Sequence, residues 1–380
     1  MSDKKVKRIL IFSLAYYPHV GGAEVAIKEV TDRTSPDEID FHMVTMRFST
    51  TDASEEKIGN IFVHRIGGGN SRWHKFLFQF NAARFASVLH RTQSFDAVWA
   101  MMAHSAGVPA ALFSLHYPSV PYILSLQEGD PISHIERTML PLWPLFTRAF
   151  KNASIILPLS TYLARWARAR GYTGPVEIVP NGVSVREFVG APIAHKGTIL
   201  ITTSRLVHKN AIDDVIRALS LLPESVHFHI LGSGPEEHTL KMLVHECGVG
   251  NRVVFLGHID RARMPSYLHA ADIFIRPSRT EGFGISFVEA MAAGLPVIAT
   301  QEGGIADFLY DEKRNPDTET TGWAVDADSP EQIAEAVKDI LVHPEQVARV
   351  VATAKRMVNE RYDWDLIAKQ MRDIFARIGV

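Results

Sequence analysis

The sequence alternates short apolar runs with segments that carry apolar residues at helical spacing, and this alternation constrains its fold more than any other feature. Helical patterns occur at residues 24–31, 73–91 and 160–170. Strands that alternate with helices form parallel sheets covered on both faces, so the pattern predicts an α/β fold with a doubly wound sheet. The strand-like runs of this first series are residues 8–14, 40–46, 62–66, 96–101, 122–127, 154–159 and 176–180.

A second series of the same kind begins at residue 197. Its strand-like runs are residues 197–205, 226–232, 252–257, 272–278 and 296–300, and its helical patterns are residues 213–222, 236–247, 263–270 and 285–293. The chain has 380 residues, which exceeds the usual size of one domain. Residues 184–196 lack regular periodicity. We expect a first domain over 1–184, a linker over 185–196, a second domain over 197–355, and a helix over 356–380 that returns to the first domain.

The composition limits which binding partners and which cellular compartment can be expected for the protein. The net charge is −2, which gives no global attraction to nucleic acid. Cys247 is the single cysteine, so an internal disulfide is excluded and a reducing compartment is indicated. The first residues lack the apolar core of a signal peptide. Residues 97–127 contain no charged side chain, but Pro109 and Pro118 interrupt them, which favours strand, helix and strand over a spanning helix. We expect a cytoplasmic protein.

The segment RPSRTEGFGISFVEAMAAGLPVIAT, residues 276–300, carries the most chemical information. It reads as a strand, a glycine-containing loop and a helix. Gly282 and Gly284 allow the backbone to approach a ligand closely. The helix that follows presents free N–H groups and the positive end of its dipole, which favour a phosphate. Glu281 precedes this helix and Glu289 lies within it, so the segment predicts an anion site flanked by two carboxylates.

Glu281 and Glu289, with the glycines between them, resemble the EX7E motif of the family 4 glycosyltransferases. Further ordered motifs extend the resemblance over most of the chain: GGAE at 21–24, PNGV at 180–183, SRLVHKN at 204–210, GSGP at 232–235 and GHI at 257–259. The resemblance implies a GT-B fold, in which two Rossmann-like domains face each other across a cleft. It also implies transfer of a sugar from a nucleotide-sugar donor with retention of configuration, with the donor bound by the second domain and the acceptor by the first.

The resemblance assigns roles to particular residues. Arg205 and Lys209 contact the donor diphosphate and, with Glu281 at the donor sugar, form the catalytic set. Glu289 binds the ribose hydroxyls. The remaining donor-binding residues contribute mainly backbone groups and are Gly21, Gly22, Gly234, Gly257, His258, Ile259, Gly282, Phe283, Gly284, Ile285 and Ser286. One departure falls in the phosphate-binding loop, where Ala211 stands in place of the glycine that the family often carries after its Lys-Asn pair.

A second departure falls in the first domain. Many family members carry a histidine after a strand that corresponds to YILSLQEGDP, residues 122–131, and Gln127 occupies its position. Glutamine can hydrogen-bond a sugar hydroxyl but cannot exchange a proton near neutral pH. A retaining reaction that uses the donor phosphate as base tolerates this loss. Gln127, Glu128 and Asp130 are therefore the acceptor-side candidates, and a polar strand end without a catalytic role is the alternative.

No metal-binding cluster is evident in the sequence, and Asp213 and Asp214 read as a solvated helix face. Arg205, Lys209 and a helix N-terminus supply positive charge where a metal would otherwise act. We therefore predict metal-independent activity, with no cofactor beyond the UDP- or GDP-sugar that serves as substrate.

Residues 71–91 mix aromatic and basic side chains at helical spacing. Two interpretations stay open. Such a helix can pack its aromatics on the sheet of its own domain, or it can lie on an anionic membrane surface near a lipid-linked acceptor. The second interpretation makes the protein peripheral at the inner face of the membrane.

Together these patterns predict a hexosyltransferase that moves sugar from a UDP- or GDP-sugar to a glycan or a lipid-linked saccharide, as in polysaccharide biosynthesis. Two alternatives remain: a GT-B epimerase or phosphorylase, and a non-catalytic sugar-nucleotide-binding protein. The second is motivated by Gln127.

Overall fold

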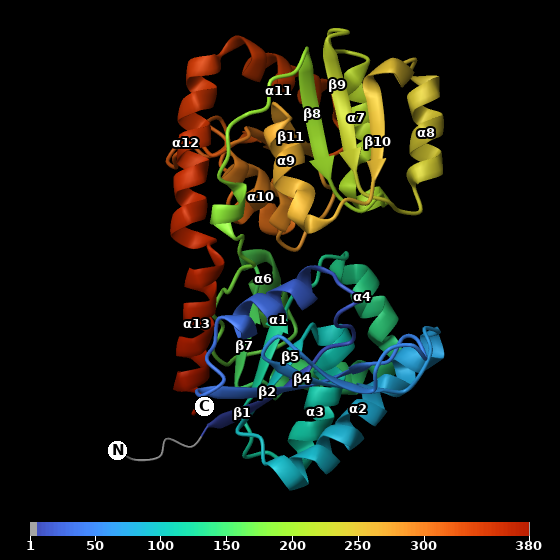
Figure 1. Ribbon diagram of the computed structural model, residues 1–380, viewed down its shortest axis with the longest axis vertical. Coiled ribbons are helices and arrows are strands. Elements are labelled where there is room, and N and C mark those ends of the chain that lie inside the picture. The colour runs from blue at the N-terminus through green and yellow to red at the C-terminus, as the bar shows by residue number, and fades with distance from the viewer. Residues whose placement is uncertain (1–5, 380) are drawn as a thin grey trace. The chain divides into compact units, whose positions relative to one another are not determined.

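The computed structural model describes residues 6–379 and contains two compact units (Figure 1). The first unit comprises the chain up to Asn181 and the segment from Trp364 onward. The second unit is Gly182–Asp363. The chain thus passes between the units twice, and its last helix belongs to the first unit.

The first unit is built on a seven-stranded sheet with the order β3-β4-β2-β1-β5-β6-β7. All neighbouring strands are parallel except β3, which runs antiparallel to β4. The central strand places Ile9 opposite Phe41 on one side and Ala97 on the other. The strands are β1 (Lys7–Phe12), β2 (Ile39–Met46), β3 (Glu55–Ile58), β4 (Ile61–Ile66), β5 (Ala97–Met101), β6 (Tyr122–Leu126) and β7 (Ile155–Pro158).

Helices cover both faces of this sheet (Figure 1). On one face, Phe375 of α13 contacts Phe41 and Trp99. On the other, Phe113 of α3 contacts Phe12. The helices of the unit are α1 (Gly22–Asp32), α2 (Arg72–Gln93), α3 (Val108–His116), α4 (Ile132–Met139), α5 (Trp143–Lys151), α6 (Thr161–Ala169) and α13 (Trp364–Arg377), with a π-helical turn η1 (Ala103–Gly107) before α3.

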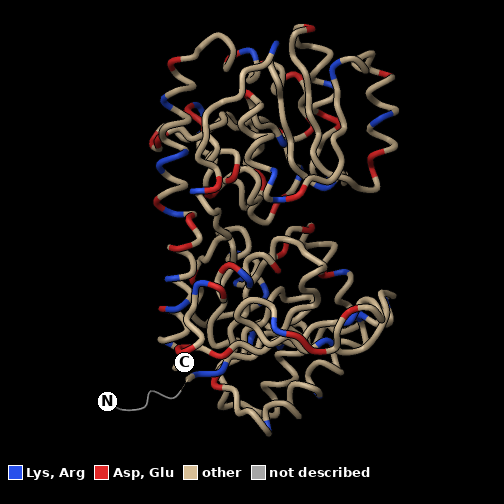
Figure 2. The backbone as a smooth tube through the Cα atoms, viewed as in Figure 1, with Lys and Arg blue, Asp and Glu red and all other residues tan. Residues whose placement is uncertain are grey.

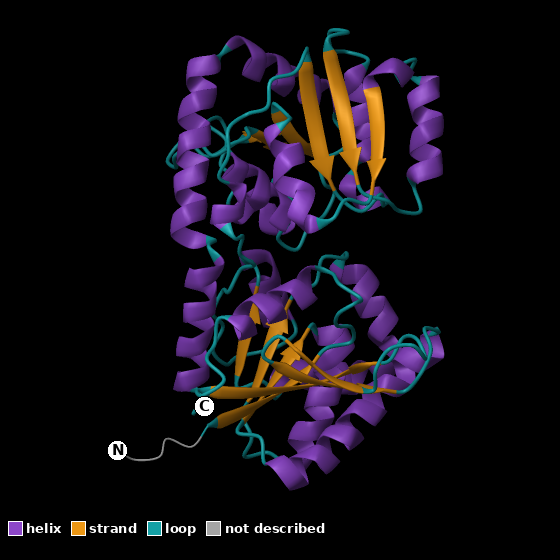
Figure 3. Ribbon diagram, in the orientation of Figure 1, coloured by secondary structure: helices purple, strands orange, loops and turns teal. Residues whose placement is uncertain are grey.

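The second unit is built on a six-stranded parallel sheet with the order β10-β9-β8-β11-β12-β13 (Figure 3). The arrowheads of β8, β9 and β10 point the same way in this view. The strands are β8 (Thr198–Thr203), β9 (Val226–Leu231), β10 (Val253–Gly257), β11 (Ile273–Arg276), β12 (Val297–Ala299) and β13 (Trp323–Ala324).

The helices of the second unit also form two layers. Val215 of α7 and Val337 of α11 share a buried cluster with Phe228 of β9. On the other face, Phe287 of α10 packs edge-on against Phe274 of β11, with ring centroids 5.5 Å apart. The helices are α7 (Ile212–Leu219), α8 (Glu237–Glu246), α9 (Met264–His269), α10 (Ile285–Ala293), α11 (Pro330–Val342) and α12 (Pro344–Arg361), with short 3₁₀ turns η3 (Val185–Phe188), η4 (His208–Asn210), η6 (Arg261–Arg263) and η7 (Gly303–Asp307).

Each sheet has one point where the chain reverses its direction of winding. In the first sheet, β1 leads to β2 on one side, and β5 lies on the other side of β1. In the second sheet, β8 leads to β9, and β11 lies on the other side of β8. Loops at the carboxyl ends of such strand pairs diverge and leave room for a ligand. The fold therefore directs attention to the loops after β1 and β5 and after β8 and β11.

The predicted doubly wound α/β fold is confirmed in both units. Helix α10 spans the residues predicted for it, and residues 97–127 form strand, helix and strand, as predicted. The predicted strand at 176–180 is wrong: this segment runs beside β7 with three backbone hydrogen bonds but forms only an isolated bridge at Val176. Pro175, just before the segment, and Pro180, its last residue, have no N–H to donate, which shortens the ladder.

The expected linker, residues 185–196, lies within the second unit. Its start forms the turn η3, and Ile193 donates its backbone N–H to the carbonyl of His269. Val183 pairs with Asp363 where the chain enters and leaves the unit. The unit therefore begins at Gly182 instead of residue 197.

Candidate functional site

The loop from β11 to α10 holds Glu281 in a fixed position. One carboxylate oxygen of Glu281 accepts a hydrogen bond from Nη2 of Arg276 at 2.8 Å, and the other accepts the N–H of Gly282 at 3.0 Å. Arg276 is buried, and its Nη1 donates to Oγ of Ser286 at 2.9 Å. Its guanidinium also lies 4.2 Å from the ring centroid of Phe287. Glu281 is thus oriented by a buried cation that sequence reasoning did not identify.

The start of α10 depends on a left-handed glycine. Gly284 has φ +89°, and a Cβ at this position would lie 2.5 Å from the ring of Phe287 and 3.1 Å from Nη2 of Arg276. Any side chain here would therefore disturb Arg276 and, through it, Glu281. Phe283 and the N-cap residue Gly284 lead into α10, and Ile285 and Ser286 begin its first turn, where helical N–H groups have no partner within the helix. The predicted anion site falls on this turn and stays a prediction.

Glu289 lies one helical turn further along α10 and is 8% exposed. Burial raises the pKa of Glu289, while the nearby guanidinium groups of Arg261 and Arg276 oppose that rise. A carboxylate kept close to two arginines and largely out of water is suited to accept hydrogen bonds from ligand hydroxyls.

The loop after β8 carries the two predicted phosphate-binding cations. Arg205 has an exposed side chain, and its carbonyl accepts the side-chain amide of Asn210 at 2.6 Å. Lys209 lies in the turn η4 and is half-buried. Ala211 follows in the left-handed region, with φ 53°, and is fully buried. The glycine that the family often carries here would adopt this conformation without strain, so the departure at Ala211 costs backbone energy.

Arg279 joins the loop after β8 to the loop after β11. Its backbone N–H donates to the carbonyl of Lys209 at 2.7 Å, and its Nη1 donates to the carbonyl of His208 at 2.7 Å. The same guanidinium binds Asp213 and Asp214. The prediction that Asp213 and Asp214 form a solvated helix face is therefore wrong, because Asp214 is buried and both carboxylates pair with an arginine that follows a distant strand.

The glycines after β9 permit close backbone packing. The N–H of Gly232 donates to the carbonyl of Gly257, at the end of β10, at 2.7 Å. A Cβ on Gly234 would lie 2.3 Å from the carbonyl of Leu206. His258 is exposed, and Ile259 is half-buried. GSGP and the Gly257 turn therefore lie at the same sheet edge as Arg205 and Glu281, and Figure 2 shows charged residues of both signs gathered along this edge.

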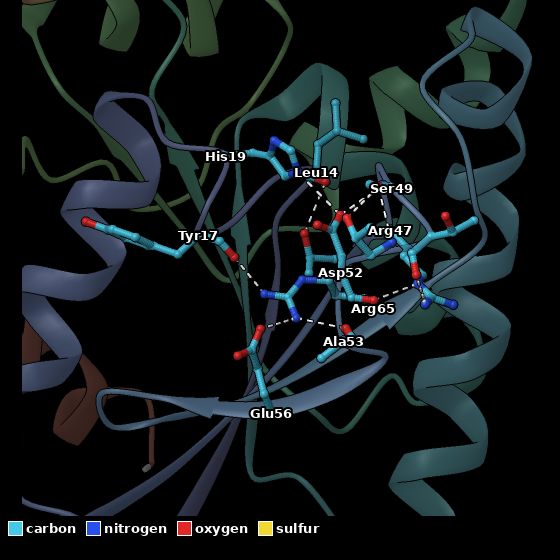
Figure 4. Close-up of polar contacts among 12 residues, drawn as sticks. Leu14, Tyr17, His19, Arg47, Ser49, Asp52, Ala53, Glu56 and Arg65 are labelled. Carbon is cyan, nitrogen blue, oxygen red and sulfur yellow. Dashed lines mark hydrogen bonds and ion pairs between the residues drawn. The ribbon is translucent and has the colours of Figure 1, made fainter.

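In the first unit, Gly21 is the N-cap residue of α1 and Gly22 is the first residue of that helix. The N–H of Gly21 donates to the Glu24 carboxylate at 2.7 Å, which caps the helix. The loop before them is held by Arg65, whose Nη2 donates to the carbonyl of Tyr17 at 2.6 Å (Figure 4). The glycines thus start a helix at the switch point of the first sheet.

The acceptor-side candidates have different surroundings from one another. Gln127 exchanges two hydrogen bonds with the amide of Asn181, at 3.1 and 3.0 Å. Glu128 is buried, and its Oε1 accepts the N–H of Ala103 at 2.6 Å and faces Nδ1 of His104 at 3.4 Å. Among the described residues, Oε2 of Glu128 has no hydrogen-bond partner. Asp130 follows β6 on the surface side of this loop and is exposed.

His104 was missed from the sequence. It lies in the turn η1, three residues after the end of β5 at the switch point of the first sheet, and two residues after Met102, which has φ 70°. A positive φ at a non-glycine residue costs energy and often marks a functional site. The charge-free character of residues 97–127 directed attention away from this histidine.

Helix α2 presents a mixed apolar and basic surface. Trp73, Leu77 and Phe80 are 73%, 51% and 38% exposed, whereas Phe78 is buried. The interpretation that the aromatics of this helix pack on the sheet is therefore wrong for Trp73 and Phe80. The exposed basic residues of the helix are Arg72, Lys75, Arg84 and Arg91.

Within residues 6–379, no helix is long and apolar enough to cross a membrane. In the same part of the chain, no group of three or more His, Cys, Asp or Glu side chains is arranged to hold a metal ion.

Two family models match consecutive parts of the chain. The model described as Glycosyltransferase Family 4 matches residues 20–187, and the model described as Glycosyl transferases group 1 matches residues 186–357. The match includes every donor-side residue considered above.

Curated relatives carry mannosyltransferase names. The chain is 30% identical over 258 residues to the GDP-mannose-dependent alpha-(1-6)-phosphatidylinositol monomannoside mannosyltransferase of Mycobacterium tuberculosis, which covers 62% of this chain and 65% of the relative. It is 25% identical over 397 residues to the GDP-mannose-dependent monoacylated alpha-(1-6)-phosphatidylinositol monomannoside mannosyltransferase of Corynebacterium glutamicum, which covers 97% of both chains.

Solved structures share the fold. The sucrose-phosphate synthase of Thermosynechococcus elongatus has a TM-score of 0.81 at 18% identity and covers 98% of this chain and 99% of its own. Anabaena HepE in complex with UDP-glucose has a TM-score of 0.78 at 19% identity and covers 97% of this chain and 99% of its own.

Proposed function

The chain belongs to the family 4 glycosyltransferases, and from this premise we propose that it transfers a hexose from a GDP- or UDP-sugar to a glycan or a lipid-linked saccharide, with retention. One observation carries the proposal. The loop with Arg205 and Lys209 and the loop with Glu281 flank the switch point of one sheet and are tied to each other through Arg279. The names of the relatives make GDP-mannose the first donor to test.

The proposed role of the donor-binding residues follows from the negative charge of the leaving diphosphate. Breaking the bond between the anomeric carbon and the diphosphate places negative charge on the leaving phosphate. Arg205, Lys209 and the first turn of α10 offer preorganised positive groups to this charge. Glu281 binds the donor sugar, and its carboxylate is held in place by Arg276. Since these groups supply the stabilisation, the reaction needs no metal ion.

The nucleotide half uses Glu289 and the glycine turns. Glu289 accepts hydrogen bonds from the ribose hydroxyls; burial raises the pKa of this carboxyl group, and nearby Arg261 and Arg276 oppose that rise. The backbone of Gly234, Gly257, His258 and Ile259 lines the base and the adjoining sugar. The N–H of Gly21 is already donated to the Glu24 carboxylate, so the role of Gly21 and Gly22 toward the donor phosphate stays a prediction.

The acceptor half is assigned to the first unit. The side-chain amide of Gln127 makes two hydrogen bonds with that of Asn181. We therefore expect Gln127 to hold these two segments of the chain together more than to orient the acceptor. Glu128 orients His104, and the imidazole, one-third exposed, hydrogen-bonds the acceptor hydroxyl. Asp130 adds a polar group to the rim of this surface. The donor's own phosphate takes the proton of the acceptor hydroxyl as the new glycosidic bond forms.

The test couples donor binding to turnover. We expect Glu281→Gln to lower kcat by about 100-fold, because it removes a charge used at the reacting centre. Lys209→Ala should weaken binding of GDP or UDP, whereas the exposed Lys338→Ala serves as a matched control. NMR of donor and acceptor mixtures reports turnover and the anomeric configuration of the product, and the same reaction in excess EDTA tests the metal independence.

Two outcomes would count against the proposal. Donor binding without turnover on a broad acceptor panel would favour the non-catalytic sugar-nucleotide-binding protein, the alternative raised by Gln127. Inversion of configuration would contradict the assigned mechanism.

A lipid surface is the second element of the proposal. The exposed face of α2 combines Trp73, Leu77 and Phe80 with basic residues, which suits the headgroup region of an anionic membrane. Such contact would make the protein peripheral at the inner face of the membrane and bring a lipid-linked acceptor to the first unit.

Flotation with vesicles tests this element. The wild-type protein should float with vesicles that contain phosphatidylglycerol and remain unbound with phosphatidylcholine alone. The triple change Trp73→Ser, Leu77→Ser and Phe80→Ser should abolish flotation, while Leu140→Ser, at another exposed apolar residue, should not. Equal flotation of the wild type and the triple variant would exclude α2 as the contact.

A further inference from the structure

Arg279 occupies the centre of a network that ties together three loops of the second unit. It lies in the loop after β11, two residues before Glu281. Toward the loop after β8, its main-chain N–H donates to the carbonyl of Lys209, and its Nη1 donates to the carbonyl of His208. Toward the loop before α11, its Nε donates to Asp328 at 2.6 Å. One side chain thus fixes the relative positions of segments that are far apart in sequence.

Carboxylates hold the guanidinium in this position. Asp213 binds it with both oxygens, each at 2.9 Å, in the bidentate geometry that arginine and carboxylate prefer. Asp214 contacts Nη2 at 3.2 and 3.3 Å. The arginine side chain is 16% exposed, and that of Asp214 is 6% exposed. An ion pair so shielded from water is screened less by salt than a surface pair.

The guanidinium has no hydrogen left to donate to a ligand. Arginine carries five side-chain N–H groups. Nε–H goes to Asp328, the two Nη1 hydrogens go to His208 and Asp213, and the two Nη2 hydrogens go to Asp213 and Asp214. This saturation separates Arg279 from the exposed Arg205, whose side chain faces solvent.

Backbone strain lies on both sides of the network. Ala211 has φ 53° in the loop after β8, and Asp328 has φ 54° in the loop before α11. A non-glycine residue in the left-handed region costs about 1 kcal/mol. Such conformations persist where surrounding contacts over-determine them. Arg279 contacts Asp328 itself and, near Ala211, contacts Lys209 and Asp213, and these contacts contribute to that constraint.

We infer that Arg279 is a positioning residue for the donor diphosphate: it holds the Lys209 loop against the Glu281 loop, so that diphosphate affinity depends on Arg279 although the donor does not touch it. The inference rests on the proposed function, because it needs Lys209 to contact the diphosphate. It adds a residue outside the motifs that assigned the donor site.

The experiment measures binding of UDP and GDP, and of uridine and guanosine, by calorimetry. Arg279→Gln should weaken diphosphate binding by about tenfold or more and leave binding of the nucleoside unchanged, since only the phosphate-binding loop is displaced. Arg217→Gln, an exposed arginine on α7, is the matched control and should change neither. Arg279→Lys keeps the charge but loses the fork, so it should restore only part of the affinity.

A double-variant cycle separates positioning from general damage. If Arg279 acts through Lys209, then Arg279→Gln should add little to the loss already caused by Lys209→Ala. Additive losses, equal loss of nucleoside and diphosphate affinity, or unchanged diphosphate affinity in Arg279→Gln would each overturn the inference. If the wild-type protein binds neither UDP nor GDP, the proposed function is overturned as well. If the wild type and Arg279→Gln bind the diphosphate equally well, only the inference is overturned.

Discussion

Both units use an arginine to hold the loop that follows the central strand of the sheet, but the two arginines have different partners. In the first unit, the Arg65 side chain is 1% exposed and donates to the carbonyls of Tyr17 and Ala53, with Glu56 as its ion-pair partner (Figure 4). In the second unit, the Arg279 side chain donates to one backbone carbonyl, that of His208, and pairs with three carboxylates. These are Asp213, Asp214 and Asp328. The first loop carries the glycines Gly21 and Gly22, and the second carries Lys209.

This difference separates a fixed support from one that responds to pH. Carbonyl acceptors do not titrate between pH 5 and 8, so the contacts of Arg65 with the loop do not depend on pH in that range. Burial, together with the charge of Asp213, raises the pKa of Asp214 to about 6, although Arg279 opposes the rise. Arg279 in turn lowers the pKa of Asp213, against the effect of its burial. The support of the donor loop can therefore gain a proton under mildly acidic conditions.

The largest effect is expected from removing the fixed support. Arg65→Met should lower the free energy of unfolding by about 3 kcal/mol, because it leaves the carbonyls of Tyr17 and Ala53 without their donor. Urea denaturation measures the change, with the exposed Arg72→Met as control. A loss below about 1 kcal/mol would show that water replaces the guanidinium and that the first loop needs no such support.

A smaller effect, on the order of 2 kcal/mol, is expected from the pH dependence of Asp214. An acid whose pKa is raised in the folded state binds a proton there between about pH 4 and 6, where the unfolded chain does not. The free energy of unfolding should therefore rise as pH falls from 7.5 to 5 through the contribution of Asp214, and Asp214→Asn should remove that contribution.

The difference between wild type and Asp214→Asn isolates this contribution from the histidines. Asp213, Asp328, Arg279 and His208 are the other charged or titratable groups that face Asp214 or its partner. Urea denaturation at several pH values gives the difference directly. A wild type and a variant whose stabilities run parallel from pH 7.5 to 5 would contradict the assignment.

The smallest effect is expected at Ala211. Ala211→Gly should raise the free energy of unfolding by up to about 1 kcal/mol, since glycine adopts φ 53° without strain, offset in part by the greater freedom of glycine in the unfolded chain. Thermal denaturation measures it, and Ala293→Gly, within α10, is a control that should destabilise. If Ala211→Gly also destabilises, the loss of the buried methyl group outweighs the relief of strain.

Local patterns predicted most of the fold. The run at residues 8–14 becomes the buried β1, and Ile285–Ala293 becomes α10 with a left-handed Gly294 at its end. These features depend on neighbouring residues: apolar periodicity, glycine at caps and proline after them. The failure at 176–180 came from the same source, because an apolar run between prolines satisfies the pattern of a strand but lacks the N–H groups of a full ladder.

Local sequence patterns predicted only part of the candidate site. Glu281, Glu289, Arg205 and Lys209 lie in ordered motifs, and the family models match the segments that contain them. Arg276 and Arg279, which hold two of these groups, sit in no motif. His104 lies within residues 97–127, whose lack of charged side chains raised the question of a membrane-spanning helix instead of a functional site.

The sequence by itself determined which residue types follow which strands, and hence a two-unit α/β protein with two carboxylates and two cations after parallel strands. The tertiary structure alone decided that Asp213 and Asp214 are ligands of Arg279 instead of a solvated face, that Gln127 is bound by Asn181, and that Trp73 is exposed. The reason is physical: strand and helix periodicity is set within a few residues, whereas the partner of a charged or polar side chain is set by which loops the sheet order brings together.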